Sequence, residues 1–137
     1  MPIPFQLPLA PERIIRGDFF PARNKPQGTL VVCHGFKGFK DWAFFPYVGE
    51  TLSEDLNVIT FNFSHNGVGE DLTQFSELEK FARNTYSMEL DDLENLFTHI
   101  RNRSLPLPPE ITQVAEPVIL LGHSRGGGVS LIFAFDH

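Results

Sequence analysis

The amino-acid sequence predicts an α/β protein with a doubly wound, mostly parallel sheet. Short β-branched runs alternate along the chain with helical patterns, which is typical of a parallel sheet with helices on both faces. Three apolar runs have the length and composition of buried strands, namely Thr29–Cys33, Asn57–Phe63 and Pro117–Leu121. A glycine-rich turn follows the last run and leads into another helical pattern over Ser124–Phe135. We expect the 137 residues to form one domain, 1–137.

The first half of the chain supplies a further strand and a helix. Arg13–Phe20 alternates between apolar and polar residues well enough to predict a strand. A helix is expected to begin near Pro46, because proline is well tolerated in the first turn of a helix. Val48, Leu52 and Leu56 are spaced to form one apolar face of this helix.

Two more helices are predicted in the middle of the chain. Ser76 and Glu79 have the spacing of a capping box, which predicts a short helix reaching about Arg83. A longer amphipathic helix is expected over 85–101. Its apolar stripe, which we expect to face the core, consists of Leu90, Leu93, Phe97 and Ile100.

Composition excludes several classes of function. The net charge is −6 and the eleven basic residues are scattered, so we expect neither a nucleic-acid nor an anionic-membrane partner. Cys33 is the single cysteine, which rules out an internal disulfide and fits a reducing compartment. The proline-broken N-terminus lacks the pattern of a signal peptide, and the apolar runs are too short to span a bilayer. These observations predict a cytoplasmic protein.

The motif that carries chemistry is Gly122-His123-Ser124-Arg125-Gly126, a G-x-S-x-G sequence. A serine in a sharp strand-to-helix turn is crowded, so positions two before and two after it require glycine. By chance alone the bare motif occurs in roughly one chain in twenty of this length. Its position between an apolar strand and an apolar helix predicts that Ser124 is a nucleophile. The alternative is a glycine-rich turn in which Ser124 only caps the helix.

A second element provides a candidate oxyanion hole. Acyl transfer needs two donors aimed at the developing oxyanion, and backbone N–H groups usually supply them. One donor is expected from Arg125, the residue after the nucleophile. The other is expected from Phe36, in the sequence His34-Gly35-Phe36 that directly follows the strand Thr29–Cys33. Alternatively, His34 and Gly35 simply end that strand.

Three segments together resemble a known family: HGFKGFKDW (34–42), FNFSHNGVGE (61–70) and GHSRGG (122–127). From about Arg13 onward, the chain resembles the N-terminal half of an α/β-hydrolase. It is most similar to small esterases and peptidases related to dienelactone hydrolases and cinnamoyl or feruloyl esterases. The resemblance implies a serine hydrolase with Ser124 as nucleophile and the amides of Phe36 and Arg125 as oxyanion hole. It also implies an acid and a histidine later in the chain, in the order Ser, Asp or Glu, His.

The acid and the histidine have no match in this sequence. Asp136 and His137 have suitable chemistry, but they follow Ser124 by about three helical turns, roughly 20 Å, and we reject them. We therefore expect an incomplete domain, truncated after the helix that carries the nucleophile, and poor activity for this chain alone. Without further strands, the helix over Val129–Phe135 is expected to expose apolar surface.

Other polar residues have both functional and structural interpretations. His65 could be a substitute base or a substrate contact, but a loop-shaping or solvent-exposed histidine is the more frequent case. Cys33 is expected to be a small core residue. Lys37, Lys40 and Arg125 could attract an anionic substrate, with solvated surface charges as the default. The five histidines lack metal-ligand spacing, so neither a metal nor a cofactor is expected.

The sequence thus predicts hydrolysis of a small-molecule ester, thioester or amide through an acyl-enzyme on Ser124. The alternative is a non-catalytic half-hydrolase that acts as a binding or oligomerising module. Its partner would be a second copy, in a homo-oligomer, or a missing C-terminal half. A third interpretation is a gene fragment without an independent function.

Overall fold

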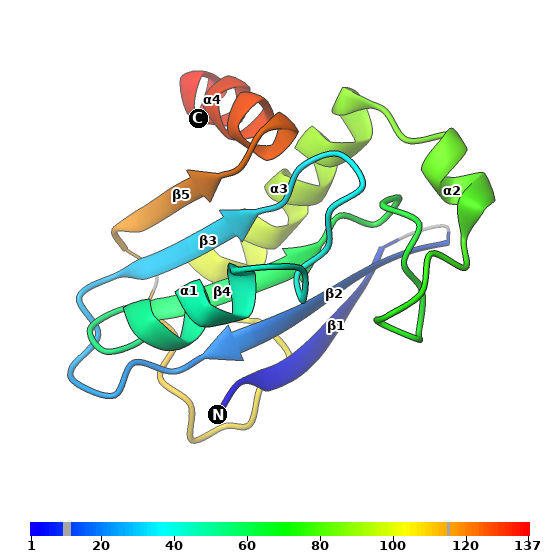
Figure 1. The fold of residues 1–137 in the computed structure, drawn as a ribbon. Coiled ribbons are helices and arrows are strands. Elements are labelled where there is room, and N and C mark those ends of the chain that lie inside the picture. Colours follow the sequence, from blue (N-terminus) through cyan, green and yellow to red (C-terminus); the bar gives the residue numbers. More distant parts are fainter. Residues whose placement is uncertain (10–11, 115) are drawn as a thin grey trace.

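The computed structural model describes residues 1–9, 12–114 and 116–137, and in these ranges five strands form one sheet (Figure 1). The sheet order is β1-β2-β4-β3-β5. The strands are β1 (Ile3–Leu9), β2 (Arg13–Phe20), β3 (Thr29–Cys33), β4 (Asn57–Asn62) and β5 (Val118–Gly122). The helices are α1 (Phe45–Leu52), α2 (Leu78–Ala82), α3 (Tyr86–Arg101) and α4 (Arg125–Asp136). The predicted α/β class is confirmed.

Strand directions divide the sheet into two parts. β3 pairs in parallel with β4 on one side and with β5 on the other. β2 pairs antiparallel with both β1 and β4, so the sheet is mixed. The carboxyl ends of β3, β4 and β5 consequently lie at one edge, where ligands bind in open α/β sheets.

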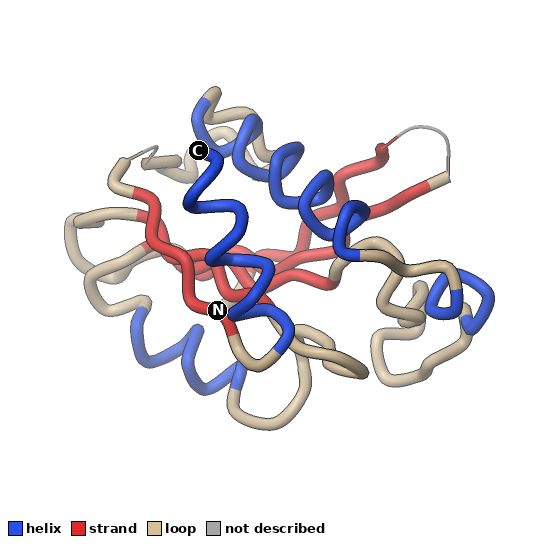
Figure 2. Tube along the Cα trace, turned by 90° about the horizontal axis from the view of Figure 1, so that it is seen from above, coloured by secondary structure: helices blue, strands red, loops and turns tan. Residues whose placement is uncertain are grey.

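Helices cover both faces of the sheet, as a doubly wound fold requires. α1 lies on one face, and α3 and α4 lie together on the other (Figure 2). Every residue of β3 and β4 is buried, which explains their β-branched and aromatic composition. The larger apolar layer, under α3 and α4, is rich in phenylalanine and includes Phe19, Phe61, Phe63, Phe97 and Phe133.

α1 begins one residue before its predicted start, with proline in its first turn. The predicted apolar face of Val48, Leu52 and Leu56 is wrong. Leu52 is exposed and Leu56 lies beyond the end of the helix, whereas the helix buries Phe45 and Gly49. At Gly49 a Cβ atom would lie 2.7 Å from the Phe20 ring, so α1 approaches the sheet through its glycine.

The sequence analysis missed β1, because Pro4 and Pro8 interrupt its pattern. Proline removes a ladder donor, but an edge strand tolerates this loss, and β1 is an edge strand.

Of the predictions for the two middle helices, one is wrong in its cap and the other is confirmed. The capping box at Ser76 is wrong, because α2 begins at Leu78 after Glu77 and its N-cap makes no side-chain hydrogen bond. α3 matches its prediction, and its N-cap Thr85 accepts a hydrogen bond from the Met88 amide at 3.2 Å.

β5 and α4 form the least covered part of the sheet. β5 was predicted to be buried, but its residues are exposed or half-buried, because in the described residues it pairs with β3 only. The expected apolar surface on α4 is present, since Leu131, Ile132 and Phe135 are 63%, 44% and 87% exposed. No helix in the described residues is long and apolar enough to cross a membrane.

Candidate functional site

Ser124 lies in the turn between β5 and α4, in a conformation that side chains rarely adopt. Its backbone has φ 55° and ψ −119°. A non-glycine residue held at positive φ typically costs about 1–3 kcal/mol, and such strain concentrates at functional sites. The alternative that Ser124 serves only as a helix cap fails, because its side chain makes no capping hydrogen bond.

The glycines on either side of Ser124 are sterically required. A Cβ atom on Gly122 would lie 2.4 Å from the Gly126 carbonyl oxygen, and one on Gly126 would lie 2.3 Å from that of Cys33. Gly127, outside the G-x-S-x-G motif, has its nearest neighbour at an ordinary 3.4 Å. The crowding thus falls on the two motif positions, as the sequence analysis predicted.

The loop after β3 packs directly against this turn. The His123 amide donates a hydrogen bond to the Cys33 carbonyl at 3.0 Å. A Cβ atom on Gly35 would lie 2.9 Å from the His123 carbonyl oxygen and 3.1 Å from the Ser124 Cβ. Gly35 therefore allows the backbone of this loop to approach the serine closely.

The amides of Phe36 and Arg125 are the predicted oxyanion donors. In the described part of the chain, neither amide donates a hydrogen bond to a protein acceptor, which leaves both available. The Phe36 ring is 61% exposed and stacks on Phe81 with ring centroids 5.4 Å apart. The assignment of the two donors stays a prediction.

His34 is structural. Its Nε2 accepts a hydrogen bond from the Phe63 amide at 3.1 Å, and its Nδ1 lies 2.9 Å from the Gly35 carbonyl oxygen. These partners require the neutral tautomer with the proton on Nδ1. Burial lowers the pKa of His34 to about 4, so the ring stays neutral and joins the loop after β3 to the end of β4.

His65 is buried in a polar network rather than solvent-exposed. Its Nδ1 lies 3.0 Å from the Ser64 hydroxyl oxygen, and that hydroxyl donates to an Asp92 oxygen at 3.0 Å. Arg13 donates to the same hydroxyl and pairs with Asp92. Burial lowers the pKa of His65 and raises that of Asp92. In the described residues no hydrogen bond joins His65 to Ser124, which favours the loop-shaping interpretation.

The three cationic side chains near the site differ in their exposure and in their contacts. Arg125 donates from Nε to Glu89 at 2.9 Å and lies 4.2 Å above the Tyr86 ring, so its side chain is held by α3. Lys37 is exposed. For Lys40 the solvated interpretation is wrong, because it is 4% exposed and pairs with Asp18 and Asp41.

An aromatic cluster beside the turn was missed by the sequence analysis. The His123 ring packs among Trp42, Phe44 and Phe45, with ring centroids 6.2, 5.6 and 5.9 Å away. Trp42 and Phe44 are partly exposed, and Phe45 is fully buried. The aromatic run Trp42–Phe45 was the available signal.

The remaining candidates are inert or distant. Cys33 is fully buried and burial raises its pKa to about 12, which confirms the core interpretation. His137 stacks on Phe133 and its Nδ1 lies 3.0 Å from the Phe133 carbonyl oxygen. In the described residues no group of histidine, cysteine or carboxylate side chains could hold a metal ion.

No protein-family model and no curated protein matches the sequence. Solved structures do match it, and two of them are an α/β serine hydrolase homologue from Coxiella burnetii and the α/β-hydrolase GrgF from Penicillium sp. sh18. The first gives a TM-score of 0.72 at 18% identity and covers 98% of this chain and 58% of its own. The second gives a TM-score of 0.69 at 21% identity and covers 98% and 41%.

The dienelactone hydrolase from Anabaena variabilis ATCC 29413 is similar over the whole of this chain. It gives a TM-score of 0.73 at 14% identity and covers 100% of this chain and 58% of its own. This chain thus has the α/β-hydrolase fold and spans 41% to 58% of the length of these three structures.

Proposed function

We propose that this chain supplies the nucleophile and the oxyanion hole of a serine hydrolase. The reaction is the cleavage of an ester, thioester or amide through an acyl-enzyme on Ser124. The observation that carries the proposal is the strained φ of Ser124 between two glycines that no other residue can replace. A structure maintains such strain where the surrounding packing enforces it, as at a nucleophile elbow.

The chemistry begins at the Ser124 hydroxyl, which attacks the substrate carbonyl while a base removes its proton. The carbonyl oxygen becomes an oxyanion, which the amides of Phe36 and Arg125 stabilise by hydrogen bonds. Loss of one such donor typically costs about 3–4 kcal/mol in barrier height. Collapse of this intermediate expels the leaving group, and water then releases the acid.

The base is the missing component. In the described residues the Ser124 hydroxyl makes no hydrogen bond, and the histidines of the loop and the turn that pack together, His34 and His123, serve other contacts. The resemblance to α/β-hydrolases implies that the acid and the histidine of a complete domain lie on the C-terminal side of α4. This chain alone is therefore expected to be a slow enzyme, with roughly 10³-fold acceleration or less from the oxyanion hole and binding.

Labelling with a fluorophosphonate probe tests the proposal, because the probe needs a nucleophilic serine and an oxyanion hole. The matched variants are Ser124→Ala and Ser76→Ala, which removes an exposed serine from a loop. We expect labelling of the wild type and of Ser76→Ala, and none of Ser124→Ala. Equal labelling of all three proteins, or no labelling of a folded wild type even with imidazole supplied as the base, would refute the role of Ser124.

A second candidate is a non-catalytic binding or oligomerising module. It is favoured by the edge of β5 that no strand covers in the described residues, and by the exposed side chains Leu131 and Phe135 on α4. A stable, monodisperse oligomer that resists the probe would support it over the catalytic proposal.

A further inference from the structure

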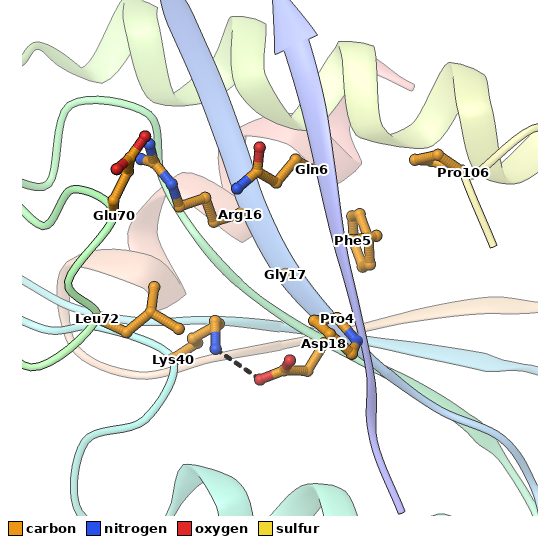
Figure 3. Close-up of a pocket in the computed structure, with 10 residues that line it drawn as sticks. All are labelled: Pro4, Phe5, Gln6, Arg16, Gly17, Asp18, Lys40, Glu70, Leu72 and Pro106. Carbon is orange, nitrogen blue, oxygen red and sulfur yellow. Dashed lines mark hydrogen bonds and ion pairs between the residues drawn. The ribbon is translucent and has the colours of Figure 1, made fainter.

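A cavity of about 420 Å³ lies well away from Ser124 in the sheet. It is lined by β1, β2, the loop after β3, the loop after β4 and Pro106 in the segment after α3 (Figure 3). Three strand steps separate β2 from β5, which is roughly 14 Å at ordinary strand spacing. The proposed hydrolase chemistry uses none of the residues that line the cavity.

Arg16 supplies the uncommitted positive charge of this cavity. The residue is only 9% exposed, and its Nε is inaccessible and has no acceptor. In the described residues Arg16 forms no ion pair. The guanidinium keeps its charge in proteins, so its burial without an anion is unfavourable. Asn62, which lies opposite Arg16 on β4, also has a buried Nδ2 donor without an acceptor.

Glu70 supplies the uncommitted negative charge. It lines the same cavity, and in the described residues it pairs with no cation. The other two charged groups that line the cavity are already paired, because Lys40 lies 2.6 Å from an Asp18 carboxylate oxygen and 2.8 Å from one of Asp41. One cation and one anion therefore remain for a ligand, and they are not paired with each other.

The cavity also has apolar walls. Leu72 lines it, together with Pro4, which lies opposite Asp18 on β1 and so on the same face of the sheet as Arg16. The volume falls within the range of about 300–1,000 Å³ that is typical of small-molecule sites.

We propose that this cavity binds a zwitterionic ligand, an α-amino acid with an apolar side chain. Its carboxylate accepts hydrogen bonds from the Arg16 guanidinium, whose planar fork suits a carboxylate. Its ammonium group pairs with Glu70, and its side chain contacts Pro4 and Leu72. A ligand with only a carboxylate would place a negative charge near Glu70 without an ammonium group to pair with it. A ligand with only an amine would place a positive charge near Arg16 without a carboxylate to pair with it.

An NMR titration of the chain with three isosteric probes tests this proposal. L-Leucine carries both charges, 4-methylpentanoate lacks the ammonium group and 3-methylbutylamine lacks the carboxylate. We expect leucine to shift the amide signals of β2 and of residues 70–72, and each of the other two to bind at least about tenfold more weakly. Failure of leucine to bind, or equally strong binding of 4-methylpentanoate, would overturn the proposal.

Variants at the two charges provide the second measurement. Arg16→Met should abolish leucine binding, whereas Lys37→Gln, which removes an exposed cation outside the cavity, should not change it. Because Arg16→Met could also unfold the sheet, Glu70→Gln is the decisive variant, since Glu70 is exposed. Glu70→Gln should weaken leucine binding at least about fivefold. Unchanged or tighter binding would indicate a site for a simple anion and would contradict the zwitterion.

Discussion

The inner and outer sides of β5 are built very differently. On the inner side, β5 pairs with β3, and the turn after it packs so tightly that the glycine positions leave no room for a Cβ atom. On the outer side, β5 has no partner strand in the described residues, and α4 exposes Leu131 and Phe135. The comparison teaches that the backbone geometry at Ser124 depends on contacts within this chain, which are dense on the inner side of β5 and sparse on its outer side. Four predictions test this contrast, from the largest expected effect to the smallest.

The tightest contact predicts the largest loss of stability. Gly126→Ala would place a Cβ atom 2.3 Å from the Cys33 carbonyl oxygen, and neither backbone can yield. We expect a loss of more than about 4 kcal/mol in unfolding free energy, enough to unfold a marginal domain. Urea denaturation followed by circular dichroism measures it.

Gly128→Ala is the matched control, because a Cβ atom there meets nothing within 4 Å and the position is helical. It should stabilise the chain by up to about 1 kcal/mol. Equal behaviour of the two variants would contradict the close approach of β3 and α4.

Substitutions of two phenylalanines of α4 compare the packed inner side with the exposed outer side. Phe133 is 2% exposed and packs on Phe97, whereas Phe135 is 87% exposed. Phe133→Ala should cost about 3 kcal/mol or more, while Phe135→Ala should stay within about 0.5 kcal/mol. Phe135→Ala should also reduce self-association, which analytical ultracentrifugation measures. If Phe135→Ala is as destabilising as Phe133→Ala, the outer side is covered in solution.

The buried His34 predicts a pH dependence of stability. Its pKa is lowered from 6.5 to about 4 in the folded chain, so the unfolded chain binds the extra proton first as the pH falls. The contribution of the neutral His34 ring to the free energy of unfolding is fully present above about pH 6.5. It is lost progressively between about pH 6.5 and 4. Its size is at most about 3 kcal/mol. Urea titrations over this range measure it, and His34→Gln should show a shallower decline. A parallel decline in both proteins would contradict the neutral, buried state of His34.

The smallest expected effect concerns the strain at Ser124. Ser124→Gly should raise the unfolding free energy by about 1 kcal/mol, because glycine adopts φ 55° without the steric cost. Ser124→Ala keeps the strain and should leave stability near that of the wild type. Thermal unfolding of the three proteins gives the comparison, and destabilisation by glycine would indicate an unstrained turn.

The sequence predicted best where a single local rule decides the structure. The G-x-S-x-G motif predicted the turn at Ser124, because the crowding at Gly122 comes from the backbone of Gly126 and Gly127 within the same turn. The prediction failed where the partner was remote. The buried face of α1 depends on where the Phe20 ring lies, and the exposure of β5 depends on which strands are its neighbours.

The contacts of polar residues were likewise beyond what local sequence patterns can predict. Periodicity could not reveal that Lys40 pairs with Asp18, because the two lie 22 residues apart in the sequence. Neither could it reveal that Asp92 on α3 reaches Ser64 beside His65, because that contact spans 28 residues. Long-range contacts of this kind decide whether a charged side chain is solvated or buried.

Rescue of acylation by an external base tests the central claim most directly. The chain is incubated with p-nitrophenyl acetate and increasing imidazole, with Ser124→Ala as the control and mass spectrometry to locate the acetyl group. If the nucleophile side is complete and only the base is missing, imidazole should accelerate acetylation at Ser124 in the wild type. Absence of acetylation at Ser124 from folded protein at every imidazole concentration would contradict a preformed nucleophile and oxyanion hole.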